Sequence, residues 1–212
     1  FPDIPMNSGF YRVLKLVVPD NSVVNAEWPV AVSGFVMPFE KIINSIFELW
    51  SRLMPERSLA CGFNVEYLQT GGYDARHEHR PYFMLYDWLS GGWGGRNGKD
   101  GLGTTASCFG TGLRTQPVEG QERLCPVRTD QSEILNDSGG PGRYRGGMGH
   151  QKSGTLLPVE GVVISYFCDR ERSIPWGLDG GLPSSPHGLW LKQNDARTFL
   201  GAVFSDVPVS EG

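Results

Sequence analysis

The residue types best suited to binding chemistry gather in one glycine-rich stretch, Asp137–Gly149, in which six of thirteen residues are glycine. Arg143 and Arg145 place two guanidinium groups beside a backbone rich in N–H donors, a combination that can bind an anion. The alternative is a crossover loop in which the arginines pair with acidic neighbours such as Asp137. We expect the second role, because a backbone with so many glycines is costly to order and forked side chains can hold it in one shape.

A second glycine-rich stretch, Ser90–Gly103, directly follows an apolar run and is a candidate pocket wall. Trp93 can cover an apolar ligand, Arg96 can hold a carboxylate or phosphoryl oxygen, and Asp100 can orient that arginine or a proton donor. The alternative is a packed loop at a subunit contact. The stretch lacks the Gly-Lys-Ser/Thr ending of a Walker A loop and the helix of a dinucleotide site, so we expect this chain to bind no nucleotide.

A charged cluster, Asp169–Arg172, follows another apolar run. We expect it to be a solvated group of ion pairs, each contributing at most about 1 kcal/mol. The alternative is that Asp169 accepts hydrogen bonds from the arginines of the first glycine-rich stretch. Asp169, Arg170 and Trp176 are therefore candidate loop-organising or interface residues.

Metal binding is not indicated by the histidines or the cysteines. His77 and His79 lie near each other, but the sequence places no third ligand beside them, and His150 and His187 are isolated and expected to be structural. The four cysteines include no C-x-x-C pair, so we expect free thiols in a reducing cytoplasm and no zinc or redox site. They are Cys61, Cys108, Cys125 and Cys168.

The elements that must position these loops include one long helix. Apolar residues recur with helical spacing from Phe39 to Met54, Pro38 suits the first turn, and Pro55 ends the pattern. We expect this amphipathic helix to bury its apolar face in the core. Substituting Ile46 by aspartate is then expected to damage folding.

Alternating or β-branched runs predict several strands between turn signals. Beyond Leu189 the pattern fades. The predicted strands are 11–18, a short piece at Val23–Val24, 63–68, 82–88, 124–127, 152–157 and 162–168.

Composition favours a folded, loop-rich α+β protein: 39% of residues are hydrophobic and 29 of 212 are glycine. We expect residues 1–212 to form one strand-rich mixed domain with glycine-rich loops at strand ends. The net charge of −4 and the absence of a long basic run argue against a nucleic acid partner, and no apolar run is long enough to cross a membrane.

Ordered blocks of sequence resemble the hydantoinase B/oxoprolinase family, which includes the large subunits of ATP-dependent hydantoinases, 5-oxoprolinases and acetone or acetophenone carboxylases. The residue sequence of Asp137–Gly149 is the first sign of this resemblance. The resemblance extends over nearly the whole chain. Asn21 stands where the family usually has glycine, but asparagine tolerates positive φ, so the turn can survive. The other matching blocks are Asn7–Arg12, Pro19–Asn25, Pro29–Ser33, Gly91–Gly101, Thr115–Glu119, Asp169–Arg170 and Pro175–Gly181.

The resemblance implies a part of an enzyme that uses ATP to activate a carbonyl of a cyclic amide for hydrolysis, or of a ketone for carboxylation. It matches the family's C-terminal half. A divalent metal is implied in the N-terminal half, which this sequence lacks, and ATP with Mg²⁺ on a hydantoinase A-like partner subunit. The sequence starts at Phe1 inside a family block, which suggests a fragment, a processed product or a separately encoded half.

The resemblance therefore implies that this chain binds no cofactor itself. Its expected partners are the hydantoinase A-like subunit, the N-terminal half and a small-molecule substrate, and we expect the Asp137–Gly149 loop to contact one of the two proteins. An alternative from a different class is a non-catalytic scaffold that holds such a complex together. The catalytic residues are not identified by sequence.

Overall fold

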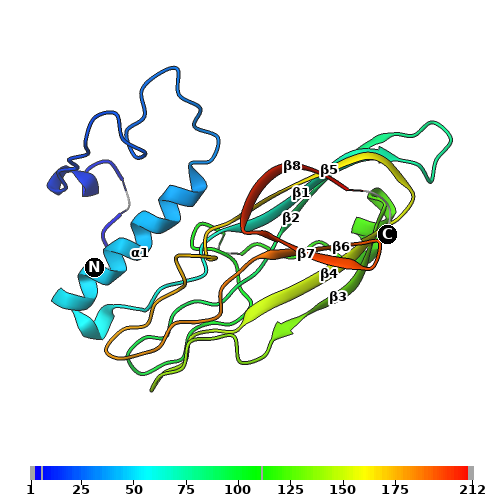
Figure 1. Cartoon of the computed structure of the whole chain (residues 1–212). Helices are drawn as coiled ribbons and strands as arrows, with labels where there is room; N and C mark the ends of the chain where they lie inside the picture. The colour runs from blue at the N-terminus through cyan, green and yellow to red at the C-terminus, as the bar shows by residue number, and fades with distance from the viewer. Residues whose placement is uncertain (1–2, 6, 111, 210–212) are drawn as a thin grey trace.

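The protein is strand-rich with little helix, as a computed structural model shows for residues 3–5, 7–110 and 112–209 (Figure 1). The predicted α+β class is confirmed. The helices of the described residues are η1 Phe10–Val13, α1 Val36–Leu53, η2 Pro55–Arg57 and α2 Val118–Leu124. The strands are β1 Glu66–Asp74, β2 Tyr82–Trp88, β3 Val127–Leu135, β4 Gly149–Leu156, β5 Val159–Cys168, β6 Leu189–Gln193, β7 Ala196–Gly201 and β8 Val203–Val209.

The largest sheet has the order β2-β1-β5-β8, and all of its pairs are antiparallel. Two hairpins, β3-β4 and β6-β7, lie beside it (Figure 1). The ladder between β1 and β5 shifts register between Gly71 and Tyr73. Glycine is required at that irregularity, because a Cβ on Gly72 would lie 2.5 Å from Val162 Cγ2.

The main core lies between this sheet and the hairpins. Its buried members include Phe83 and Leu85 from β2 and Val162 and Ile164 from β5, which follow the period-two alternation of half-buried strands. A smaller cluster contains Tyr166, Cys168 and Ala202 and borders the functional site described below.

The long helix is present, but the burial predicted for its apolar face is wrong in this chain. Trp50 is 42% exposed and Leu53 70% exposed, and Ile46 is also largely exposed. The buried residues of α1 are polar instead, Glu40 and Asn44. Apolar periodicity indicates that a helix has one apolar face, but not whether other residues of this chain cover that face.

The predicted strand at 11–18 is wrong. Its start is the 3-10 helix η1, and residues 14–18 belong to no strand and are exposed except for the half-buried Val18. Residues 124–127 span the end of α2 and the start of β3, and Val23–Val24 form a turn closed by a bridge between Ser22 and Asn25. Asn21 has a φ of 50°, in the region that asparagine tolerates.

The other strand predictions are largely confirmed. β2 matches its predicted range, and β4 and β5 contain most of theirs. β1 begins three residues after the predicted start and continues through Gly71 and Gly72 to Asp74, beyond the predicted end. β6, β7 and β8 were missed, and so was β3 apart from its first residue, Val127. No helix of the described residues is long and apolar enough to cross a membrane.

Candidate functional site

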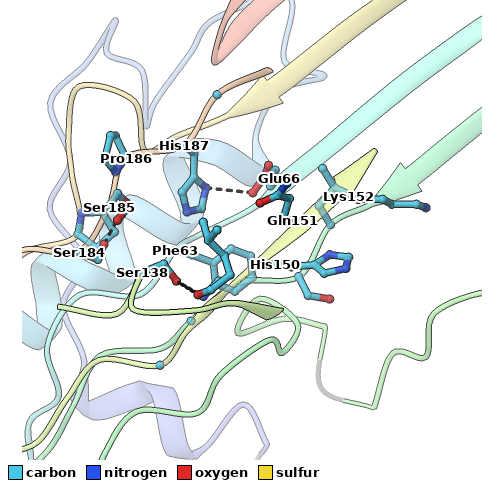
Figure 2. Close-up of a pocket in the computed structure, with 18 of the residues that line it drawn as sticks. Phe63, Glu66, Ser138, His150, Gln151, Lys152, Ser184, Ser185, Pro186 and His187 are labelled. Carbon is cyan, nitrogen blue, oxygen red and sulfur yellow. Dashed lines mark hydrogen bonds and ion pairs between the residues drawn. The ribbon is translucent and has the colours of Figure 1, made fainter. Parts of the chain in front are cut away.

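A deep cleft of about 1860 Å³ lies between the glycine-rich loops, the β3-β4 hairpin and the segment before β6. Figure 2 shows side chains from several of these segments pointing toward a common space. Such a cleft is the default candidate for a binding site, provided that polar groups converge on it.

The two glycine-rich stretches form the floor of the cleft by bonding to each other along their backbones. The Gly147 amide donates to the Trp93 carbonyl oxygen at 2.8 Å, and the Gly101 amide donates to the Arg145 carbonyl oxygen at 2.8 Å. The Thr104 amide donates to the Met148 carbonyl oxygen at 2.8 Å. The loops are thus one structural unit.

Close approach explains why glycine is needed in these loops. A Cβ on Gly147 would lie 1.9 Å from the Leu102 carbonyl oxygen, and one on Gly101 would lie 1.9 Å from the Trp93 carbonyl oxygen. No glycine of Asp137–Gly149 has positive φ, whereas Asp137 itself has a φ of 57°. The absent side chain, not the left-handed region, is what the fold uses here.

The three candidates of the second stretch do not act as one group. Trp93 and Arg96 line the cleft, and the Trp93 indole Nε1 donates to the Ala106 carbonyl oxygen at 3.0 Å. Asp100 is not among the described lining residues. Its carboxylate accepts the Arg145 amide at 2.7 Å and so joins the two loops.

Within the first stretch, Arg145 Nη2 donates to Asp137 Oδ1 at 2.9 Å. Both side chains are at least half exposed, at 51% and 86%. Arg143 lines the cleft, and its guanidinium carbon lies 5.6 Å from the centre of the Tyr144 ring. In the described structure, Asp169 accepts no hydrogen bond from either of these arginines. That Arg143 and Arg145 hold the loop in one shape stays a prediction.

The expectation of a solvated cluster at Asp169–Arg172 is wrong, because Asp169 and Arg170 are buried. The Arg170 guanidinium donates from Nη2 to Asn64 Oδ1 at 2.7 Å and to Cys61 Sγ at 2.8 Å. Asp169 accepts from Asn64 Nδ2 at 3.1 Å and pairs with Lys41 of α1 at 3.3 Å. Asn64 is hydrogen-bonded to both buried charged side chains, Asp169 and Arg170.

Trp176 stands next to this network and lines the cleft. Its carbonyl oxygen accepts the Cys61 amide at 3.1 Å, which ties the turn after Arg170 to the segment before β1. The sequence candidates Arg170 and Trp176 are therefore brought together by their shared contacts with Cys61.

A polar cluster that sequence reasoning missed lies at one end of the cleft: Glu66, Cys168 and His187. His187 Nδ1 lies 2.9 Å from Glu66 Oε2 (Figure 2). The same nitrogen lies 3.2 Å from Cys168 Sγ. The Tyr166 hydroxyl donates to Glu66 Oε1. Burial, and after it the Glu66 carboxylate, raise the pKa of the Cys168 thiol. His187 is thus not isolated, contrary to our expectation.

Further polar side chains line the wall formed by the β3-β4 hairpin. Lys152 Nζ pairs with Asp87 at 2.5 Å, and His150 Nε2 lies 3.0 Å from Ser132 Oγ. Burial, and then Lys152, lower the pKa of His150, which favours its neutral form. Lys152 therefore lies in the cleft as one half of an ion pair with Asp87, which also lines it.

The remaining sequence candidates lie elsewhere. The His77 and His79 rings are 5.7 Å apart between centroids, and His77 Nε2 lies 3.7 Å from Asp74 Oδ2. These residues do not belong to a group of three donors in the described structure. All four cysteines are free thiols.

Comparison with known proteins places the whole chain in one family. The model of the hydantoinase B/oxoprolinase family matches residues 1–212, so the chain belongs to the hydantoinase B/oxoprolinase family. The resemblance expected from the sequence blocks is thereby confirmed.

Two curated relatives carry informative names. The chain is 25% identical over 200 residues to a candidate D-/L-hydantoinase component of Pseudomonas sp. strain NS671, covering 94% of this chain and 33% of the relative. It is 29% identical over 161 residues to the beta chain of caprolactamase from Pseudomonas jessenii, covering 74% of this chain and 27% of the relative. The chain therefore spans about a third of the length of these relatives.

A solved structure shares the fold. The nucleotide-free structure of acetone carboxylase, described in a study of ATP-dependent acetone carboxylation, matches with a TM-score of 0.56 and 23% identity. The match covers 66% of this chain and 18% of that chain.

Proposed function

We propose that this chain forms part of the active-site wall of a multi-subunit, ATP-dependent enzyme. That enzyme activates a carbonyl of a cyclic amide of the hydantoin, oxoproline or lactam type for hydrolysis, or a ketone carbonyl for carboxylation. Family membership supports the reaction class, and the names of the relatives span both chemistries. We place the complex in the cytoplasm, which the four free thiols support.

The main observation that supports the proposal is a cleft lined by positively charged side chains. The glycine-rich loops are bonded to each other through backbone groups and carry Arg96 and Arg143 at the lining. Lys152 also lines the cleft, but its ammonium group is paired with Asp87. Negative charge develops on a carbonyl oxygen as it is attacked or phosphorylated, and fixed cations lower the energy of that state.

The residues of this chain do not fit a nucleotide site. The Gly101 and Gly147 amides of these stretches donate to carbonyl oxygens of the opposite glycine-rich loop and do not face a phosphate. We therefore assign ATP and its Mg²⁺ to a hydantoinase A-like partner subunit. By family resemblance the divalent metal of the reaction belongs to the N-terminal half, which is the second expected partner.

The direct test is an Arg96→Ala variant in the assembled complex. We expect normal assembly and a loss of turnover of at least about tenfold, because a charge-stabilising group is removed. Lys99→Ala is the matched control, since this cation lies in the same loop but outside the described lining. Unchanged turnover in the Arg96 variant would contradict the proposal.

An alternative, that the chain is a non-catalytic interface module, is favoured by the exposed apolar face of α1. An Asp100→Ala variant distinguishes the two functions, because Asp100 joins the loops without lining the cleft. Loss of assembly, measured by size-exclusion chromatography, supports the interface function. Normal assembly with lost turnover supports a role of the joined loops in the reaction.

A further inference from the structure

The cluster at the end of the cleft combines three side chains of the kinds that bind transition metals. Glu66, Cys168 and His187 each offer one donor atom, and the three atoms all lie within 4.8 Å of one another. Carboxylate oxygen, thiolate sulfur and imidazole nitrogen are the protein ligands of Zn²⁺.

The backbone fixes all three positions. Glu66 lies directly opposite Cys168 in the antiparallel ladder of β1 and β5, which places both side chains on the same face of the sheet. The His187 amide donates to the Arg170 carbonyl oxygen at 3.0 Å, so the third residue is tied to the chain two positions beyond Cys168. Ligands held by a strand pair and a bonded loop need little reorganisation on binding.

We propose that Glu66 Oε2, Cys168 Sγ and His187 Nδ1 form a binding site for one divalent transition metal ion, with Zn²⁺ as the best match. A thiolate and a carboxylate with a neutral imidazole carry two negative charges, which balance the ion. Metal sites with thiolate and imidazole donors select Zn²⁺ and Co²⁺ over Mg²⁺ and Ca²⁺, which prefer oxygen ligands.

The surroundings fit such a site. The Cys168 side chain is buried, and the Glu66 and His187 side chains are only 12% and 17% exposed. Tyr166 donates to Glu66 Oε1, which leaves Oε2 for the ion and orients the carboxylate in the manner of an outer-shell partner. Glu66 and His187 line the cleft, so a fourth position can remain open to water or a ligand.

Binding involves no redox step. The Cys168 thiol loses its proton to solvent as the metal–sulfur bond forms, and His187 binds the ion through an Nδ1 atom that carries no proton. This site differs from the prediction made from the sequence, which placed no metal in this chain. It is independent of the proposed function, because the family metal was assigned to the missing half.

The test uses the purified 212-residue chain, freed of metal with a chelator and titrated with Co²⁺. We expect saturation at one ion per chain, with a sulfur-to-cobalt charge-transfer band in the near ultraviolet. The Cys168→Ser variant should lose that band. Loss of an outer-shell partner typically weakens metal binding by roughly 10- to 100-fold, and we expect a reduction of that size in Co²⁺ affinity for Tyr166→Phe. The Glu66→Gln and His187→Gln variants remove a ligand itself and should lose more affinity than that.

Cys125→Ser and His77→Gln are matched controls, because these residues carry the same chemistry outside the cluster. Both should bind Co²⁺ as the parent chain does. Circular dichroism of every variant separates lost ligands from lost folding. Absence of saturable Co²⁺ binding by the folded parent, or a charge-transfer band that survives in folded Cys168→Ser, would overturn the proposal.

Discussion

The Gly147 amide donates a hydrogen bond to the Trp93 carbonyl oxygen, and this contact brings the two glycine-rich loops within backbone distance of each other. A side chain at position 147 has no space, because its Cβ would lie 1.9 Å from the Leu102 carbonyl oxygen. The requirement for glycine at this position is therefore steric, since Gly147 does not have positive φ.

We therefore predict that Gly147→Val lowers the free energy of unfolding by about 3 kcal/mol or more, because backbone atoms must move apart. Thermal or urea unfolding measures the effect. Gly149→Ala is the control, since a Cβ there would meet the Ser138 hydroxyl at an ordinary 3.5 Å. Equal unfolding free energies for the two variants would contradict the steric explanation.

The Arg145–Asp137 pair leads to a prediction of a small effect. Because both side chains are at least half exposed, Arg145→Lys should lower the free energy of unfolding of the chain by less than about 1 kcal/mol. In the assembled complex the same substitution should weaken assembly if the loop contacts a partner, since lysine cannot make the forked contact. A many-fold rise in substrate KM with normal assembly would instead identify Arg145 as a ligand-binding residue.

Arg170 should be far more important for folding. Arg170→Met leaves Asn64 and Cys61 without their buried donor, and we expect a loss of about 3 kcal/mol in the free energy of unfolding. The exposed neighbour Arg172 provides the control variant Arg172→Met, which should change that free energy by less than about 0.5 kcal/mol. Similar losses in both would show that burial does not decide the effect.

The thiols give a pH-dependent prediction. Burial, and then Glu40, raise the pKa of Cys108 from its ordinary value of 9.0 to about 12. The folded state thus favours the neutral thiol, so its contribution to stability is present below pH 9 and is lost as the pH rises toward about 12.

At pH 9 the folded chain should accordingly alkylate at Cys108 about 500-fold more slowly than the unfolded chain, as measured by mass spectrometry of the peptide. Glu40→Gln should raise the rate, because the carboxylate accepts from this thiol at 3.1 Å. After unfolding without reductant, all four thiols should react. Two fewer would reveal a disulfide.

We also predict that the chain by itself neither binds Mg-ATP nor turns over a hydantoin, oxoproline, lactam or ketone. The loops that could face phosphate use their amides internally, and the family metal site is expected in the N-terminal half. Isothermal calorimetry with Mg-ATP tests the first statement. Saturable binding in the micromolar range would contradict it.

The elements with strong local patterns were predictable from sequence. β2 alternates clearly between turn signals, and α1 has helical apolar spacing with proline at each end. The segment at 11–18 alternates equally well but has no partner strand, and alternation does not reveal whether a ladder exists. β6 and β7 were missed although Asn194 and Asp195, both at positive φ, are typical of a tight hairpin turn.

The candidate site was only partly predictable. Trp93, Arg96, Arg143 and Trp176 were selected from their loops, and all four line the cleft. Glu66, Cys168 and His187 carry no local motif, because they come from three segments that meet only through the β1–β5 ladder and the loop before β6. Pairing of distant segments is decided by the fold, so single residues of this kind look ordinary in sequence.

Helix α1 is joined to the sheet by polar contacts, while its apolar face points outward. Lys41 pairs with Asp169, and the Asn44 amide group bonds to both Asn64 and Gly62. Heat capacity follows the apolar area that is exposed or covered. Separation of α1 from the sheet should thus change the heat capacity little, whereas coverage of α1 by another protein surface should give association a large negative heat-capacity change.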